Sequence, residues 1–197
     1  MNGEISYLHR VQGRPAEMTD EALVAACGKG DRAALGALFD RHHRCVYRFL
    51  ARFAGTDDRD LDDLVQATFV EVLRSAARFG GRSAVRTWLL GIAHNVVRHH
   101  VRSEVRRRKA LEAVAEAPAD PGATPDAEAE RRQQLARLAK ALAELSEPLR
   151  VVFVMCDLEQ VPGVEAARVL GLRPGTVWRR LHDARKALAR QIERSPA

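Results

Sequence analysis

The stretch from residue 161 to residue 186 has the pattern of a helix, a glycine turn and a second, arginine-rich helix. Ala167 is small where two helices would cross, and Gly171, four residues later, can adopt the left-handed backbone that ends a helix. Val177 follows six residues after Gly171 and supplies an apolar anchor. This spacing predicts a helix-turn-helix, which lays its second helix in the DNA major groove. An ordinary helical hairpin with solvated arginines is the alternative.

The second helix of this motif separates into an apolar stripe and a polar face. Val177, Leu181, Ala184 and Leu188 recur at helical spacing and form the expected buried stripe. Thr176 is the expected N-cap. The candidate residues for contact with duplex DNA are Arg173, Thr176, Trp178, Arg179, Arg180, His182, Asp183 and Lys186.

A second basic segment, residues 95–109, lies in another part of the chain. The net charge of +6 favours a polyanionic partner, and its clustering in two segments points to two nucleic-acid surfaces. Aromatic residues make up only 5% of the chain, and the apolar residues are mostly Ala, Val and Leu. Such a composition favours small helical bundles over β-sandwiches.

Apolar residues at intervals of three and four predict four helices in the N-terminal half. The first is capped by Thr19 or Asp20, and the second by Asp31. The third starts in the acidic cluster at residues 57–63, where carboxylates favour the positive end of the helix dipole. The fourth begins after Ser83, and its expected stripe is Val85, Trp88, Leu89, Ile92, Ala93, Val96 and Val101.

The composition changes between residues 113 and 130, where three prolines, a glycine and five acidic residues occur without a basic one. Such a segment is typical of a flexible linker. The sequence therefore predicts an all-α protein with two small helical domains joined by a flexible linker, the C-terminal one containing the helix-turn-helix. The expected boundaries are a tail at 1–17, a domain at 18–112, the linker at 113–130 and a second domain at 131–197.

Four motifs in order resemble the extracytoplasmic-function (ECF) family of bacterial RNA polymerase sigma factors. Residues 62–69, Asp-Asp-Leu-Val-Gln-Ala-Thr-Phe, are similar to the signature that binds core polymerase. Residues 83–95, from Ser83 to Asn95, are similar to the segment that melts and reads the −10 element. Residues 145–153 and 173–187 are similar to the domain that binds the −35 element. The resemblance covers roughly residues 20–190.

The resemblance implies that the N-terminal domain binds core RNA polymerase and captures the non-template −10 strand, while the C-terminal domain reads −35 duplex. The implied partners are core polymerase, promoter DNA and an anti-sigma factor. The implied polymerase-binding residues are Asp62, Asp63, Leu64, Gln66 and Phe69. The implied −10 residues are Ser83, Arg86, Asn95, Arg98 and Arg102.

These roles are chemically reasonable for the side chains. Asn95 lies just off the apolar stripe, where its amide could hydrogen-bond the edge of an unstacked base or could simply be a surface residue. Arg98 and Arg102, four residues apart, share a helix face and can follow phosphates. The periodicity of Trp88 favours a core position over base stacking.

The chain departs from the family pattern in both helices of the motif. Trp178 stands where Lys or Arg is usual, Arg179 where Ser is usual, and Asp183 where a basic residue is common. Asp183 could specify a cytosine through its N4 amino group, or pair with Arg179 or Arg180 within the helix. Residues 161–163, Val-Pro-Gly, replace a more usual Ser-Tyr type of start.

The remaining residues fit a cytoplasmic protein without metal or cofactor, and the resemblance implies that the protein is not an enzyme. Three dispersed cysteines do not suggest a disulfide framework, no run of about 18 apolar residues predicts a membrane span, and no signal peptide is evident. Two histidine groups, at residues 42–45 and 94–100, lack the spacing of known metal motifs. We therefore expect no metal site, and the resemblance implies that the chain has no catalytic residue.

Two other function classes compete with this interpretation. A stand-alone repressor would bind two half-sites about one helical turn apart without polymerase. The linker argues against it, because a sensor domain normally needs rigid coupling to its reader. A metal-dependent nuclease would use the acidic cluster at residues 57–63. Carboxylates contiguous at one helix start cannot converge on a single ion from several sides, which argues against that class.

Overall fold

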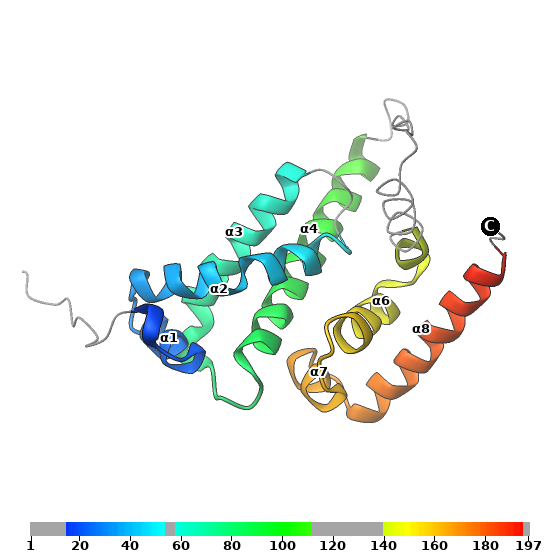
Figure 1. Cartoon of the computed structure of the whole chain (residues 1–197). Coiled ribbons are helices and arrows are strands. Elements are labelled where there is room, and N and C mark those ends of the chain that lie inside the picture. The colour runs from blue at the N-terminus through cyan, green and yellow to red at the C-terminus, as the bar shows by residue number, and fades with distance from the viewer. Residues whose placement is uncertain (1–14, 54–57, 112–139, 195–197) are drawn as a thin grey trace, which may run out of the picture.

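The computed structural model describes residues 15–53, 58–111 and 140–194, and every regular element within these ranges is helical (Figure 1). The predicted all-α class is confirmed. The predicted linker at 113–130 and most of the predicted N-terminal tail lie outside the described residues. The helices form two groups, an N-terminal domain from α1 to α4 and a C-terminal domain from α6 to α8.

The N-terminal domain contains four α-helices, and local capping fixes the starts of the first two. The elements are η1 (Pro15–Glu17), α1 (Asp20–Cys27), α2 (Arg32–Leu50), α3 (Asp58–Ser75), η2 (Ala76–Arg78) and α4 (Val85–Leu111). Thr19 caps α1 by accepting a hydrogen bond from the Ala22 N–H at 3.3 Å. Asp31 caps α2 through the N–H groups of Ala33 and Ala34, at 2.9 and 3.1 Å. The sequence predicted Asp31 as the cap of α2, and it left Thr19 and Asp20 as alternatives for α1, of which Thr19 is the cap.

Helix α4 is the central element of the fold, because it packs against α2, α3 and α7. Because these three helices cover α4 from different sides, it buries residues outside the single predicted apolar stripe. Leu90 and Val97 are fully buried although the predicted stripe omits them, whereas Val101, which it includes, is 39% exposed. The prediction for this helix was therefore wrong in its second half, where the stripe continues through Val97 instead of Val101.

The C-terminal domain contains α6 (Glu147–Phe153), α7 (Gly163–Val169) and α8 (Pro174–Arg194). Between α6 and α7 the backbone continues as a π-helical turn, η3 (Val154–Leu158). The turn ends in an unusual conformation, since Gln160 has a φ of +55°. Val152, Met155, Val177 and Ala184 are fully buried and join α6, η3 and α8.

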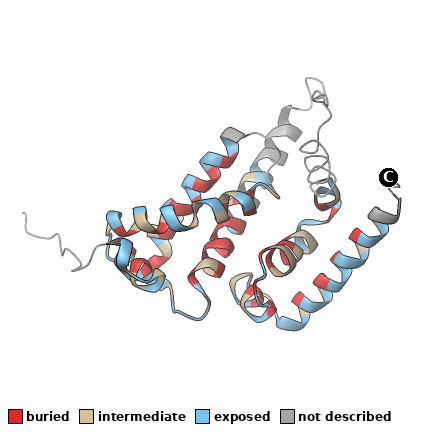
Figure 2. Ribbon diagram, in the orientation of Figure 1, coloured by how far each residue is buried: buried red, intermediate tan, exposed pale blue. Residues whose placement is uncertain are grey.

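The two domains are in direct contact along α4 (Figure 1). Helix α7 packs on α4, and the buried apolar side chains of both domains form one continuous cluster. Figure 2 shows buried residues on the inward faces of the helices and a mostly exposed outer face on α8. The shared contact therefore sets the relative position of the two predicted nucleic-acid surfaces.

Replacing Asp31 tests the cap at the start of α2. We expect Asp31→Ala to lower the free energy of unfolding by about 0.5–2 kcal/mol, because two helix N–H groups lose their acceptor. Asp31→Ser retains a capping oxygen and is expected to lose only a fraction of that. Chemical denaturation followed by circular dichroism measures both. Equal losses for Ala and Ser would contradict the capping role.

Candidate nucleic-acid interface

The predicted helix-turn-helix is present as α7, a short turn and α8. Gly171 has a φ of +66°, the left-handed conformation for which glycine is suited. The N–H of Leu172 donates to the carbonyl of Ala167 at 2.8 Å, which closes the end of α7. Ala167 and Val177 are buried at the crossing. Helix α8 begins at Pro174, so Thr176 lies in its first turn and is not the predicted N-cap.

Helix α8 presents a polar face to solvent. The predicted stripe is confirmed, since Val177, Leu181, Ala184 and Leu188 are buried. The candidate residues on the outer side are exposed, apart from two half-buried ones, Thr176 and Arg180; the exposed residues are Arg173, Trp178, Arg179, His182, Asp183 and Lys186. A cationic face of this kind is suited to phosphates and base edges.

Asp183 and Arg185, two charged residues on α8, differ in whether they form an ion pair. In the described part of the chain, Asp183 forms no ion pair with Arg179 or Arg180, which were its expected partners within the helix. Arg185, which the sequence analysis did not single out, donates two hydrogen bonds to Asp157 at 2.8 and 2.6 Å. This bidentate pair ties α8 to the π-helical turn, although the Arg185 side chain remains 60% exposed.

The indole ring of Trp178 packs against the backbone on one side and is exposed to solvent on the other. A Cβ atom on Gly163 would lie 2.8 Å from the indole ring, so the ring rests directly on the glycine backbone. The Trp178 side chain is nevertheless 53% exposed. The first turn of α8 therefore carries a fixed apolar surface beside its arginines.

The predicted polymerase-binding residues on α3 divide into exposed and buried members. Asp62, Asp63 and Gln66 are exposed. Leu64 and Phe69 are 5% and 4% exposed, because they belong to the core stripe, so they support this face without forming it. Val70, 49% exposed, adds an apolar contact beside the acidic residues that the sequence analysis missed.

A groove between α3 and α4 brings together two of the five predicted −10 residues, Asn95 and Arg98. It has a volume of about 780 Å³, and its lining includes Trp88, Asn95, Arg98, Arg74 and Arg78. Asn95 is exposed, and the Arg98 Nε has no hydrogen-bond partner in the described part of the chain. An amide, guanidinium groups and an aromatic edge in one groove can hold an unstacked base and its phosphates.

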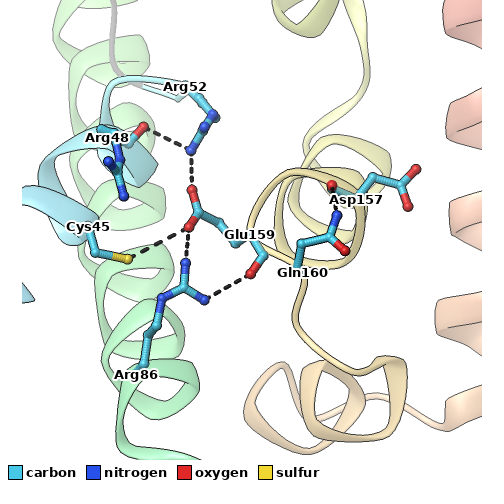
Figure 3. Close-up of polar contacts among 7 residues, drawn as sticks. All are labelled: Cys45, Arg48, Arg52, Arg86, Asp157, Glu159 and Gln160. Carbon is cyan, nitrogen blue, oxygen red and sulfur yellow. Dashed lines mark hydrogen bonds and ion pairs between the residues drawn. The ribbon is translucent and has the colours of Figure 1, made fainter.

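The other −10 candidates lie apart from this groove. Ser83 is half-buried beside the start of α4, and Arg102 is exposed on the same helix. Arg86 points toward the C-terminal domain, where its guanidinium pairs with Glu159 (Figure 3). The structure thus gathers Asn95 and Arg98 in the groove but leaves Arg86 engaged elsewhere.

Glu159 was not singled out from the sequence, yet it is one of the most constrained charges in the molecule. Its side chain is 4% exposed and pairs with both Arg52 and Arg86 (Figure 3). Arg86 also donates to the Glu159 carbonyl at 2.8 Å, and the Cys45 thiol lies 3.7 Å from the carboxylate. Nothing in the local pattern signals this, because the partners are 107 and 73 residues away.

The histidines examined as metal candidates have other partners. His42 Nε2 lies 2.7 Å from Asp20, and His43 Nδ1 lies 2.9 Å from the carbonyl of Phe39. His94 Nε2 lies 2.8 Å from Glu147, and burial lowers the pKa of His94 although Glu147 opposes the shift. Within the described residues no group of three His, Cys, Asp or Glu side chains could hold a metal ion.

Among the described helices, none is long and apolar enough to cross a membrane.

Comparison with known proteins matches both halves of the chain. The sigma-70 region 2 family matches residues 38–107, and the sigma-70 region 4 family matches residues 135–188. The ECF RNA polymerase sigma factor SigC of Mycobacterium tuberculosis (strain CDC 1551 / Oshkosh) is 31% identical over 172 residues, which cover 87% of this chain and 90% of that protein. SigM of Mycobacterium tuberculosis (strain ATCC 25618 / H37Rv) is 34% identical, covering 89% and 86%.

Solved structures agree with these sequence matches. CnrH, determined in complex with the cytosolic domain of CnrY, has a TM-score of 0.66 and 28% identity, and the match covers 90% of this chain and 99% of that one. A sigma factor RpoE from Bartonella quintana, at 22% identity and a TM-score of 0.62, shares the fold. The chain therefore belongs to the ECF family of RNA polymerase sigma factors.

Proposed function

We propose that this chain binds core RNA polymerase and directs promoter-specific initiation, reading the −10 element through the α3–α4 groove and the −35 element through α8. The observation that supports the proposal is that one ECF sigma fold carries two separate surfaces whose side chains are suited to nucleic acid. One is a helix-turn-helix suited to duplex, and the other is a groove with Asn95 and Arg98 suited to single-stranded bases.

The acidic start of α3 is proposed to dock on the polymerase. Asp62, Asp63 and Gln66 are exposed on one face, with the apolar Val70 beside them. Such a surface fits a partner that offers arginines around an apolar patch. The chain contributes positioning and no bond chemistry, so the proposed active centre is that of the polymerase, and the proposed location is the cytoplasm.

An anti-sigma factor is proposed as a further partner. The support is the similarity to CnrH, which was solved with a second protein, the cytosolic domain of CnrY, bound to it. The surfaces described above are the ones that such a partner would have to cover to prevent initiation.

The central test is reconstitution. Purified chain and core polymerase are expected to co-elute in gel filtration and to initiate from a promoter selected with the reconstituted holoenzyme. Neither component alone is expected to initiate there. Tight duplex binding by the chain at two half-sites about one helical turn apart, with no polymerase binding, would instead indicate a stand-alone repressor.

A crossed pair of variants separates the two proposed roles of the N-terminal domain. Asn95→Ala is expected to cost about 1–3 kcal/mol in promoter opening, because one base loses its hydrogen-bonding partner, and to leave polymerase binding intact. Asp62→Ala with Asp63→Ala is expected to weaken polymerase binding, while promoter opening recovers at saturating protein. Permanganate footprinting measures opening, and fluorescence anisotropy measures binding. Loss of polymerase binding in Asn95→Ala would indicate a folding role instead.

Trp178 is expected to contact a thymine methyl group in the −35 duplex, because its fixed ring is the apolar surface in the first turn of α8. Replacing the contacted thymine by uracil should then weaken binding about fourfold, since a buried methyl group contributes about 0.8 kcal/mol. Trp178→Ala should bind more weakly and lose this sensitivity. An equal uracil effect in both proteins, measured by electrophoretic mobility shift, would exclude the contact.

A further inference from the structure

We propose that Gly163 is a positioning residue for promoter reading: because it has no side chain, it holds the indole ring of Trp178 in one orientation, in which the free face of the ring meets a thymine methyl group of the −35 duplex. This inference deepens the proposed function and rests on it. It joins two residues on different helices of the helix-turn-helix, Gly163 at the start of α7 and Trp178 near the start of α8.

The contact between the two residues leaves no room for a side chain at position 163. A Cβ atom on Gly163 would lie 2.8 Å from both Cη2 and Cζ2 of Trp178, and 3.3 Å from Cε2. These three atoms belong to the six-membered ring of the indole. That side of the ring therefore rests on the glycine, and Gly163 is buried although it begins a helix.

The backbone of Gly163 does not itself require glycine. In the described part of the chain, the residues with a positive φ are Gly30, Gly81, Gln160 and Gly171, and Gly163 is not among them. It is the first residue of α7, and alanine is more favourable than glycine in helical backbone. The absence of a side chain is therefore explained by the indole ring that lies over it.

Packing, and not hydrogen bonding, fixes the orientation of the ring. The indole N–H of Trp178 donates to no residue within the described ranges. The side chain would otherwise rotate about its two torsions, and the backbone of α7 restricts that rotation. A side chain that is already held in its binding orientation loses less entropy when a ligand binds. Gly163 thus prepares Trp178 for contact.

Trp178 remains exposed in spite of this contact. It is 53% exposed, and no other Phe, Tyr or Trp in the described ranges is classed with it as exposed. An apolar ring that faces water while its orientation is fixed has the properties of an interaction site. The exposed face of the indole is therefore the part that a ligand would cover.

The position of Trp178 favours a base over a phosphate. It lies near the start of α8, and the first residues of a recognition helix are the ones that reach base edges in the major groove. An indole is uncharged, and the thymine methyl group is the apolar group that base pairs present there. Arg173 and Arg179, both exposed nearby in the sequence, provide the charge that phosphates require.

A methyl group at position 163 is expected to displace the ring and to leave the helices in place. The atoms that it would meet are at the far end of the Trp178 side chain, which can rotate away because the ring already borders solvent. The substitution Gly163→Ala therefore separates two roles. It should change promoter specificity, while the fold and its thermal stability are retained.

The main test uses −35 duplexes in which each thymine is replaced singly by uracil, which lacks the methyl group. At one position the wild type is expected to bind the thymine duplex about fourfold more tightly, the equivalent of one buried methyl group. Gly163→Ala should lose most of this preference. Electrophoretic mobility shift of the full chain measures both. The proposal is overturned if Gly163→Ala keeps the preference while binding both duplexes more weakly, or if the wild type has no preference.

A matched control makes the same substitution elsewhere. Gly36 lies within α2, and a Cβ atom there would meet nothing within 4 Å. Gly36→Ala should therefore keep the thymine preference of the wild type. Thermal denaturation followed by circular dichroism is expected to show that both alanine variants are at least as stable as the wild type. A loss of preference in Gly36→Ala as well would refute a specific role for Gly163.

A double-mutant cycle tests whether the two residues act together. In the Trp178→Ala background, Gly163→Ala is expected to change neither the affinity nor the response to uracil, because no ring is left to displace. An effect of equal size with and without the indole would show that the glycine acts independently of Trp178, which would refute the proposal.

Fluorine NMR follows the ring without any DNA. In protein labelled with fluorotryptophan, Trp88 and Trp178 give the two resonances, and Trp178→Phe assigns them. Gly163→Ala should shift the Trp178 resonance and leave that of Trp88 in place. A Trp178 resonance that does not move would contradict the displacement of the ring.

Reconstituted transcription keeps this inference distinguishable from the proposed function. If the wild type and Gly36→Ala initiate with core polymerase while Gly163→Ala keeps the thymine preference, only the inference fails. If none of the proteins binds polymerase or initiates, the proposed function fails, whatever the NMR spectra show.

Discussion

Glu159 is the charged residue that joins the two domains most directly, because both of its arginine partners belong to the N-terminal domain. The residue follows the π-helical turn, and its N–H donates to the carbonyl of Val154 at 2.9 Å. The wider turn and the positive φ of Gln160 direct the chain away from the α6 axis before α7 begins. Single π-turns are frequent at functional sites. Here the irregular turn carries the charge that engages both Arg52 and Arg86 (Figure 3).

Features that depend on neighbouring residues were predictable from the sequence. The caps at Thr19 and Asp31 need only an oxygen two or three residues before an N–H, and the left-handed turn at Gly171 needs only a missing side chain. The surface of α4 was not predictable in the same way. A prediction from hydrophobic periodicity assumes that only one face of a helix is buried. Helix α4 is instead covered by α2, α3 and α7, so the residues next to Val97 in the sequence do not indicate that it is buried.

Contacts between residues far apart in the chain explain departures from the family pattern that seem unrelated in the sequence. Gly163 and Trp178 each depart from the family pattern, and the structure shows that they are complementary, because the indole ring occupies the space that a Cβ at residue 163 would need. Glu159 is a similar case, with its partners far away in the chain. Leu64 and Phe69 illustrate the reverse, since a signature that resembles a docking motif contains core residues as well.

The contact between the two domains combines carboxylates of the C-terminal domain with cations and donors of the N-terminal domain. A basic surface able to hold phosphates also attracts carboxylates on the same chain, and tethering raises their effective concentration, so individually modest contacts suffice. Glu147, Glu159 and Glu165 all meet groups of the N-terminal domain in this way. These charged contacts surround the apolar packing of α7 on α4, so both kinds of interaction hold the two domains in one arrangement.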